Sequence, residues 1–176
     1  MKKDSTLEKQ GSELCRSCGL CCIGAVCNVT LVSPEEDREF ANLFKEELVE
    51  EENGQKCWVD QPCVAFKGNC SQYKIRPIDC RTYQCALLKK FLSGKTTFKN
   101  ASKTVRLTLT TLEKTTAQYN AQHSQSLTRD EISPVMKTLK RKAEAGGQQK
   151  TFWLRFPDYM TFCWKSPKCC RGKLLE

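Results

Sequence analysis

The sequence predicts a mainly α-helical protein with few short strands, in which irregular metal-binding loops take over part of the role of an apolar core. Two observations lead to this prediction. The 176-residue chain is only 39% hydrophobic, below the roughly 45–50% typical of globular domains. Ten of its thirteen cysteines lie between Cys15 and Cys85, the others being Cys163, Cys169 and Cys170. A cysteine-rich domain short of apolar residues is expected to fold around a metal.

Three segments are expected in chain order. Residues 1–14 are a flexible polar leader, residues 15–94 a cysteine-cluster metal-binding domain, and residues 95–176 a basic, aromatic-ended extension that packs on it. The leader lacks the apolar stretch of about 7–15 residues of a secretory signal. No stretch approaches the about 18 apolar residues of a membrane-spanning helix. A cytoplasmic protein with reduced thiols and no membrane contact is therefore expected.

The first elements follow the cysteine run. Residues 27–32 are rich in β-branched side chains and predict a short strand. Ser33 and Glu36 have the spacing of a capping box, which predicts a helix over residues 34–52 that ends at Gly54. Its apolar side chains recur at helical spacing: Phe40, Leu43, Phe44 and Leu48.

The segment of residues 57–80 carries cysteines without clear periodicity and predicts irregular loops. Pro77 is expected to open a helix that ends at Gly94. Cys80 and Cys85 would lie about 140° apart around such a helix. Because that separation keeps their sulfur atoms apart, Cys80 is expected at or before the start of the helix.

The second half gives a mixed signal. Residues 103–119 are rich in threonine and alternate like a strand before they become more helical, so their assignment stays open. Ser133 begins a predicted helix that runs to about Ala145 and ends at Gly146. Six aromatic side chains of the tail are expected to form the core of this half: Phe152, Trp153, Phe156, Tyr159, Phe162 and Trp164.

The run Cys15-Arg-Ser-Cys18-Gly-Leu-Cys21-Cys22 brings four thiols within a few residues. Thiolates this close repel one another unless a cation or an iron–sulfur cluster neutralises them, or unless they oxidise. In a reducing compartment, clustered cysteines favour metal binding over disulfides. The single histidine, His123, lies in a polar stretch far from the cysteines. Any site is therefore nearly all sulfur, which leaves four-cysteine zinc or a cysteine-ligated iron–sulfur cluster.

Two separated motifs together resemble a known family. The run at Cys15 is followed by Cys63-x6-Cys70-x2-Tyr73-x2-Arg-Pro-x2-Cys80-Arg-x-Tyr-x-Cys85. This pattern is similar to the bacterial CxxCxxCC cysteine-cluster family, whose members are described as zinc- or iron-chelating. The resemblance covers about residues 15–85. It implies these metal ligands: Cys15, Cys18, Cys21, Cys22, Cys63, Cys70, Cys80 and Cys85. Outside the pattern fall Cys27, Cys57, Cys163, Cys169 and Cys170.

The choice of cofactor stays open, with an iron–sulfur cluster slightly favoured over zinc. The start of the run is like that of a bacterial ferredoxin, but Cys22 follows directly where a ferredoxin has C-x3-C-P. Arg76 and Arg81 flank Cys80 and are candidates to donate hydrogen bonds to the sulfur atoms. Pairing of these arginines with Asp79 or Asp60 is the structural alternative.

We expect an accessory or electron-transfer protein that binds a metal or a cluster through cysteine. Whether it is an enzyme stays open. One histidine and the lack of nucleotide-binding motifs exclude triads, P-loops and Rossmann sites. A small Fe–S enzyme acting on a protein or methyl donor, by analogy with the flagellin lysine N-methylase, is one alternative.

A zinc-scaffolded nucleic-acid-binding protein is the other alternative. Residues 101–176 carry 14 basic and 6 acidic side chains, a net charge of +8. Such a basic surface is more typical of solubility or of an acidic protein partner than of a nucleic-acid site.

Overall fold

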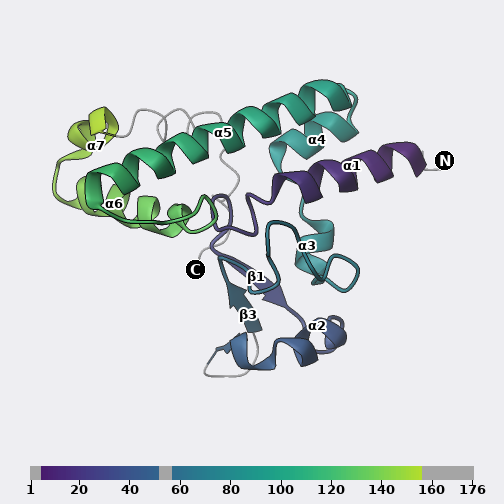
Figure 1. Cartoon of the computed structure of the whole chain (residues 1–176). Helices are drawn as coiled ribbons and strands as arrows, with labels where there is room; N and C mark the ends of the chain where they lie inside the picture. Colours follow the sequence, from purple (N-terminus) through teal and green to yellow (C-terminus); the bar gives the residue numbers. More distant parts are fainter. Residues whose placement is uncertain (1–4, 52–56, 156–176) are drawn as a thin grey trace. The chain divides into compact units, whose positions relative to one another are not determined.

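The computed structural model describes residues 5–51 and 57–155, drawn as ribbons in Figure 1. The chain divides into two compact units. One unit is the continuous segment Gly19–Cys85, and the other combines Met1–Cys18 with Ala86–Glu176. The described residues form helices and one sheet of three short strands. The predicted mainly α-helical class with few strands is therefore confirmed.

The unit Gly19–Cys85 is built on the sheet. Strands β1 (Val29–Val32), β2 (Val49–Glu50) and β3 (Cys57–Asp60) are antiparallel in the order β1-β3-β2. Alternate strand residues face the core, as the two-residue period of a strand requires. The buried residues of this core are Val32, Phe40, Ala41, Cys57, Val59 and Ala65. The predicted strand over residues 27–32 matches β1, two residues shorter at its start.

The helix predicted over residues 34–52 is much shorter in the structure. Helix α2 spans only Arg38–Leu43, and a 3-10 turn, η1 (Lys45–Glu47), leads into β2. Ser33 Oγ accepts the backbone N–H of Glu36 at 3.4 Å, but this hydrogen bond closes a turn ahead of the helix. The N-cap of α2 is Asp37, which makes no side-chain cap hydrogen bond, so the capping position predicted at Ser33 is wrong. Beyond Leu43, however, the chain leaves the helix to pair with β3, and this strand pairing overrides the local helix propensity. The predicted stop at Gly54 lies outside the described residues.

The helix predicted from Pro77 is two helices. Helix α3 spans Ile78–Thr82 and ends because Tyr83 is extended. Helix α4 spans Ala86–Leu92 and belongs to the other unit. Cys80 lies in the middle of α3, so its expected place at or before the helix start is wrong. The segment of residues 57–80 opens with β3 and continues mostly in turns, so it is less irregular than predicted.

The other unit is helical throughout its described residues. Helices α1 (Ser5–Cys18), α4 and α5 (Phe98–His123) pack against one another, as Figure 1 shows. Their shared core contains Leu14, Phe91, Ala101 and Val105. Residues 5–14, expected within a flexible leader, are helical because Leu7 and Leu14 recur after two helical turns and pack on this core. Helix α4 is followed by Gly94 at a φ of +72°, and the predicted end is confirmed.

The threonine-rich stretch of residues 103–119 is part of the long helix α5, so the helical assignment holds and the strand-like alternation does not reflect a strand. Leu107 is 51% exposed, whereas Val105 and Leu112 are buried, which is a helical pattern. Five threonine side chains each donate a hydroxyl hydrogen bond to the backbone carbonyl four residues earlier: Thr104, Thr108, Thr111, Thr115 and Thr116. This back-bonding satisfies polar groups that otherwise compete with a helix.

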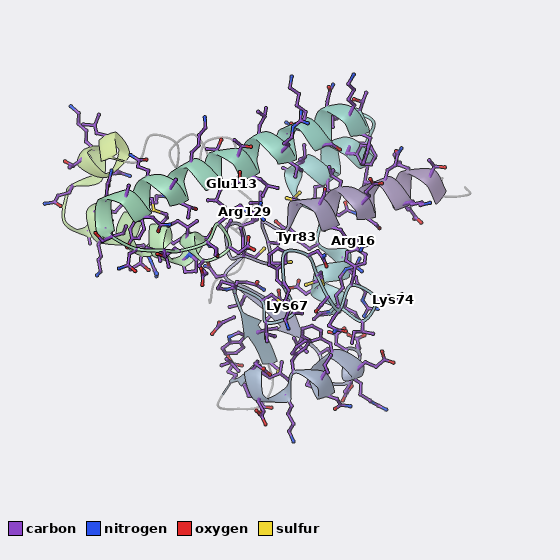
Figure 2. All side chains as sticks on the ribbon, in the orientation of Figure 1. Arg16, Lys67, Lys74, Tyr83, Glu113 and Arg129 are labelled. Carbon is purple, nitrogen blue, oxygen red and sulfur yellow. The ribbon has the colours of Figure 1, made fainter. Side chains whose placement is uncertain are left out.

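The predicted helix from Ser133 to Ala145 is confirmed as α6 (Ile132–Ala145), with Gly146 at its C-cap. The turn before it is fixed by an ion pair, because Arg129 Nη1 lies 3.2 Å from Glu113 Oε1 on α5 (Figure 2). Helix α7 spans Gln149–Arg155. Phe152 and Trp153 lie on α7, whereas Phe156, Tyr159, Phe162 and Trp164 lie outside the described residues, so the aromatic core of the tail stays a prediction. None of the helices among the described residues has the length and apolar composition needed to cross a bilayer.

Candidate metal centre

Cys63, Cys70 and Cys80 are brought together within the unit Gly19–Cys85. Their thiols lie close enough to influence one another electrostatically. Cys63 and Cys70 come from one closed loop after β3, in which Phe66 N–H donates to the Cys63 carbonyl at 2.9 Å and Phe66 bridges to Cys70. Cys80 comes from α3. Three thiols from two segments, the loop after β3 and helix α3, therefore share one neighbourhood.

This neighbourhood disfavours free thiolates. Burial raises the pKa of Cys63, and it raises the pKa of Cys80 to about 12. The neighbouring thiols add to both shifts, while a hydrogen bond from the Cys80 thiol to Thr30 Oγ1 at 3.7 Å lowers the Cys80 value. Reactive redox cysteines have lowered pKa values in electropositive surroundings. The pKa values of Cys63 and Cys80 are raised instead, and a nearby metal cation would favour deprotonation of both thiols.

The main chain of the first cysteine run touches this loop. The Cys63 N–H donates to the Cys22 carbonyl at 2.7 Å. The turn that carries Cys21 and Cys22 is closed by the N–H groups of Ala25 and Val26, which both donate to the Leu20 carbonyl. A backbone hydrogen bond therefore links Cys22, one of the predicted ligands in the first cysteine run, to Cys63.

The other predicted ligands are divided between the two units. Cys15 and Cys18 lie on α1 and belong to the other unit, while Cys85 ends the unit that holds the three thiols. Within residues 5–51 and 57–155, no three His, Cys, Asp or Glu side chains are arranged to hold a metal ion as they stand. The eight-cysteine ligand set therefore stays a prediction. Cys163, Cys169 and Cys170 lie outside the described residues.

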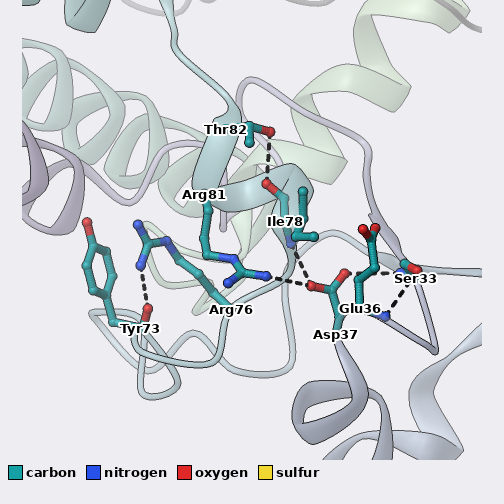
Figure 3. Close-up of polar contacts among 8 residues, drawn as sticks. All are labelled: Ser33, Glu36, Asp37, Tyr73, Arg76, Ile78, Arg81 and Thr82. Atoms are coloured by element: carbon teal, nitrogen blue, oxygen red, sulfur yellow. Dashed lines mark hydrogen bonds and ion pairs between the residues drawn. The ribbon is translucent and has the colours of Figure 1, made fainter.

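The two arginines beside Cys80 have partners that sequence reasoning missed. Arg76 donates to the Tyr73 carbonyl and stacks over the Tyr73 ring at 3.7 Å from its centroid (Figure 3). Arg81 pairs with Asp37 at 3.1 Å, rather than with Asp79 or Asp60. No local spacing signals a pair 44 residues apart. A role of Arg76 and Arg81 in binding sulfur stays a prediction.

Gly19, inside the first cysteine run, is required by its surroundings. Its φ is +63°, and a Cβ there would lie 2.7 Å from Cζ of Phe66, in the loop between Cys63 and Cys70. The glycine therefore allows the run to approach this loop closely.

Gly19→Ala is expected to destabilise the protein more than Gly68→Ala. Both alanines would adopt a left-handed conformation, but Gly68, at a φ of +75°, has no atom within 4 Å of an added Cβ. The difference should be about 1–3 kcal/mol in the free energy of unfolding, the usual cost of overpacking. Denaturant titration of the two variants measures it. Equal losses would show that Phe66 moves aside freely.

The fold and the gathered thiols define a class, the small cysteine-cluster proteins with a sulfur-rich candidate metal site. A family model described as CxxCxxCC, a putative zinc- or iron-chelating domain, matches residues 14–125. The chain belongs to this family. Comparison with curated proteins and with solved structures gave no match.

Proposed function

We propose that the chain is a cysteine-ligated metal-binding protein of the accessory or electron-transfer type, with Cys63, Cys70 and Cys80 as three of its ligands. The supporting observation is that a loop and a helix bring these thiols into one neighbourhood, where burial opposes the ionisation of Cys63 and Cys80. Soft thiolates suit zinc and iron–sulfur clusters. A family of zinc- or iron-chelating domains agrees with this chemistry.

Cys22 is proposed as the fourth ligand, because its carbonyl accepts the Cys63 N–H. Both a structural zinc site and a [4Fe–4S] cluster take four cysteines. Zinc would supply folding energy, whereas a cluster would supply an electron-transfer centre.

Metal content after anaerobic purification tests this proposal. We expect either stoichiometric zinc in a colourless protein, or iron and sulfide with broad visible absorption. Reloading the chelated protein with Zn²⁺ near pH 7 should release at least two protons for each metal bound, because Cys63 and Cys80 are protonated beforehand. Calorimetry in buffers of different ionisation enthalpy counts these protons. Neither zinc nor iron above trace, together with no binding on reloading, would refute the proposal.

A further inference from the structure

The position of Cys80 depends on contacts from outside its own helix. Helix α3 has five residues, and its N-cap, Pro77, makes no side-chain cap hydrogen bond. A helix this short is not stable by itself, because nucleation is unfavourable. The orientation of the Cys80 thiol must therefore be fixed by other parts of the unit Gly19–Cys85.

Asp37 supplies such contacts on both sides of Cys80. Its Oδ1 accepts the backbone N–H of Ile78 at 2.8 Å and Nη2 of Arg81 at 3.1 Å (Figure 3). Its Oδ2 accepts the backbone N–H of Ser33 at 3.1 Å. The Ile78 N–H is one of the donors that a helix leaves unsatisfied at its first turn. Asp37 thus caps α3 from a distant part of the chain.

The burial of Asp37 makes this arrangement rigid. Its side chain is only 2% exposed, whereas that of Arg81 is 42% exposed. A buried carboxylate needs its hydrogen bonds, so it holds its donors in place. Because these donors belong to residues 78 and 81, the backbone of Cys80 is held between them.

Two further contacts place α3 on β1. Asp79 Oδ2 accepts the Leu31 N–H at 3.1 Å, and the Cys80 thiol donates to Thr30 Oγ1 at 3.7 Å. Gln61 Nε2 donates to the same Thr30 oxygen at 2.9 Å. The sulfur of Cys80 therefore points to the Thr30 hydroxyl on β1, while the hydrogen bonds of Asp37 fix helix α3, on which Cys80 lies.

We propose that Asp37 is the positioning residue for Cys80, and that it aims this thiol at the site shared with Cys63 and Cys70. This inference rests on the proposed metal-binding function. Outer partners of metal ligands typically contribute about 10–100-fold to metal affinity. Asp37→Ala should weaken metal binding by a factor in that range.

Co²⁺ titration of the full-length chain, prepared anaerobically and free of metal, tests the proposal. The intensity of the sulfur-to-cobalt charge-transfer band reports how many thiolates bind. We expect Asp37→Ala to bind more weakly and to lose band intensity at saturation, as one thiolate fails to engage. Asp37→Asn, which retains a hydrogen-bond acceptor of the same size, should restore much of both.

Two controls separate positioning from general destabilisation. Glu36→Gln alters an exposed neighbouring carboxylate and should change nothing. Phe40→Leu weakens the core of the same unit and should leave the saturated band unchanged. If Asp37→Ala fails to fold, Asp37→Asn and Arg81→Gln are compared with the wild-type chain instead. We expect each of them to lose Co²⁺ affinity and band intensity, but less than Asp37→Ala would.

The outcomes distinguish the two proposals. If the wild-type chain binds no Co²⁺, the proposed metal-binding function fails, and this inference fails with it. If the wild-type chain binds and the Asp37 variants match it in affinity and band intensity, only the positioning role is overturned. A loss in Asp37→Ala no different from that in Phe40→Leu would also overturn it.

Discussion

Cys80→Ala is expected to lower the metal affinity of the chain by more than about 100-fold, since even outer partners of ligands contribute about 10–100-fold. The substitution removes a thiol that interacts with both Cys63 and Cys70 and lies at the centre of α3. With one of the proposed ligands missing, a four-cysteine site cannot close. Competition with a chromophoric chelator of known zinc affinity measures the change.

Cys57→Ala is the matched control for this prediction. Cys57 is 5% exposed, packs in the core of the same unit and lies outside the family's cysteine pattern. A cysteine sulfur atom is removed in both variants, and Cys57 is the more buried of the two residues. We expect Cys57→Ala to keep wild-type metal affinity. Equal affinities of Cys80→Ala and Cys57→Ala would remove Cys80 from the ligand set.

Phe40→Ala is expected to destabilise the unit Gly19–Cys85 by about 3–5 kcal/mol, the usual cost of deleting a buried phenylalanine ring. Phe40 is 1% exposed, and its ring lies 4.8 Å from that of Phe44. It packs with Val32, Cys57 and Val59 beneath the sheet. This loss is a large fraction of the free energy of unfolding of a typical domain, which is about 5–15 kcal/mol.

Leu43→Ala on the same helix provides the control. Leu43 is 54% exposed, so its substitution should change the free energy of unfolding by no more than about 0.5 kcal/mol. Denaturant unfolding in the presence of a chelator, followed by circular dichroism and tryptophan fluorescence, measures both variants. The chelator is needed because a bound metal stabilises by mass action. Similar midpoints for the two variants would contradict the core assigned to this unit.

The predictable parts of the fold are those whose signals are local. Helix α6, predicted from Ser133 to Ala145, begins at Ile132 and has Gly146 at its C-cap, and the left-handed Gly94 follows α4. Both ends depend on backbone preferences of single residues. Helix α2 was overestimated because Val49 pairs with Trp58 on a second strand, and the apolar spacing within residues 34–52 does not reveal that partner. The assignment of residues 103–119 stayed open because threonine is frequent in strands, whereas in α5 the threonine hydroxyls bond within the helix.

The features of the candidate site also divide into those that the sequence predicts and those that depend on contacts between segments. Cysteine spacing and the Arg-Pro and Cys-Arg pattern predicted the family and the type of ligand, because these are properties of residue identity and order. No spacing could predict the contact of Asp37 with Ile78 and Arg81, or of Thr30 with Cys80.

The sequence by itself therefore determined the mainly helical class, the family and a sulfur-rich chemistry. Only the tertiary structure decided that Cys63, Cys70 and Cys80 share one neighbourhood, and that a buried carboxylate on a different segment fixes α3. The physical reason is that helix starts, helix ends and ligand types depend on neighbouring residues. The position of a thiol instead depends on packing and hydrogen bonds between segments about 40 residues apart, which no local pattern encodes.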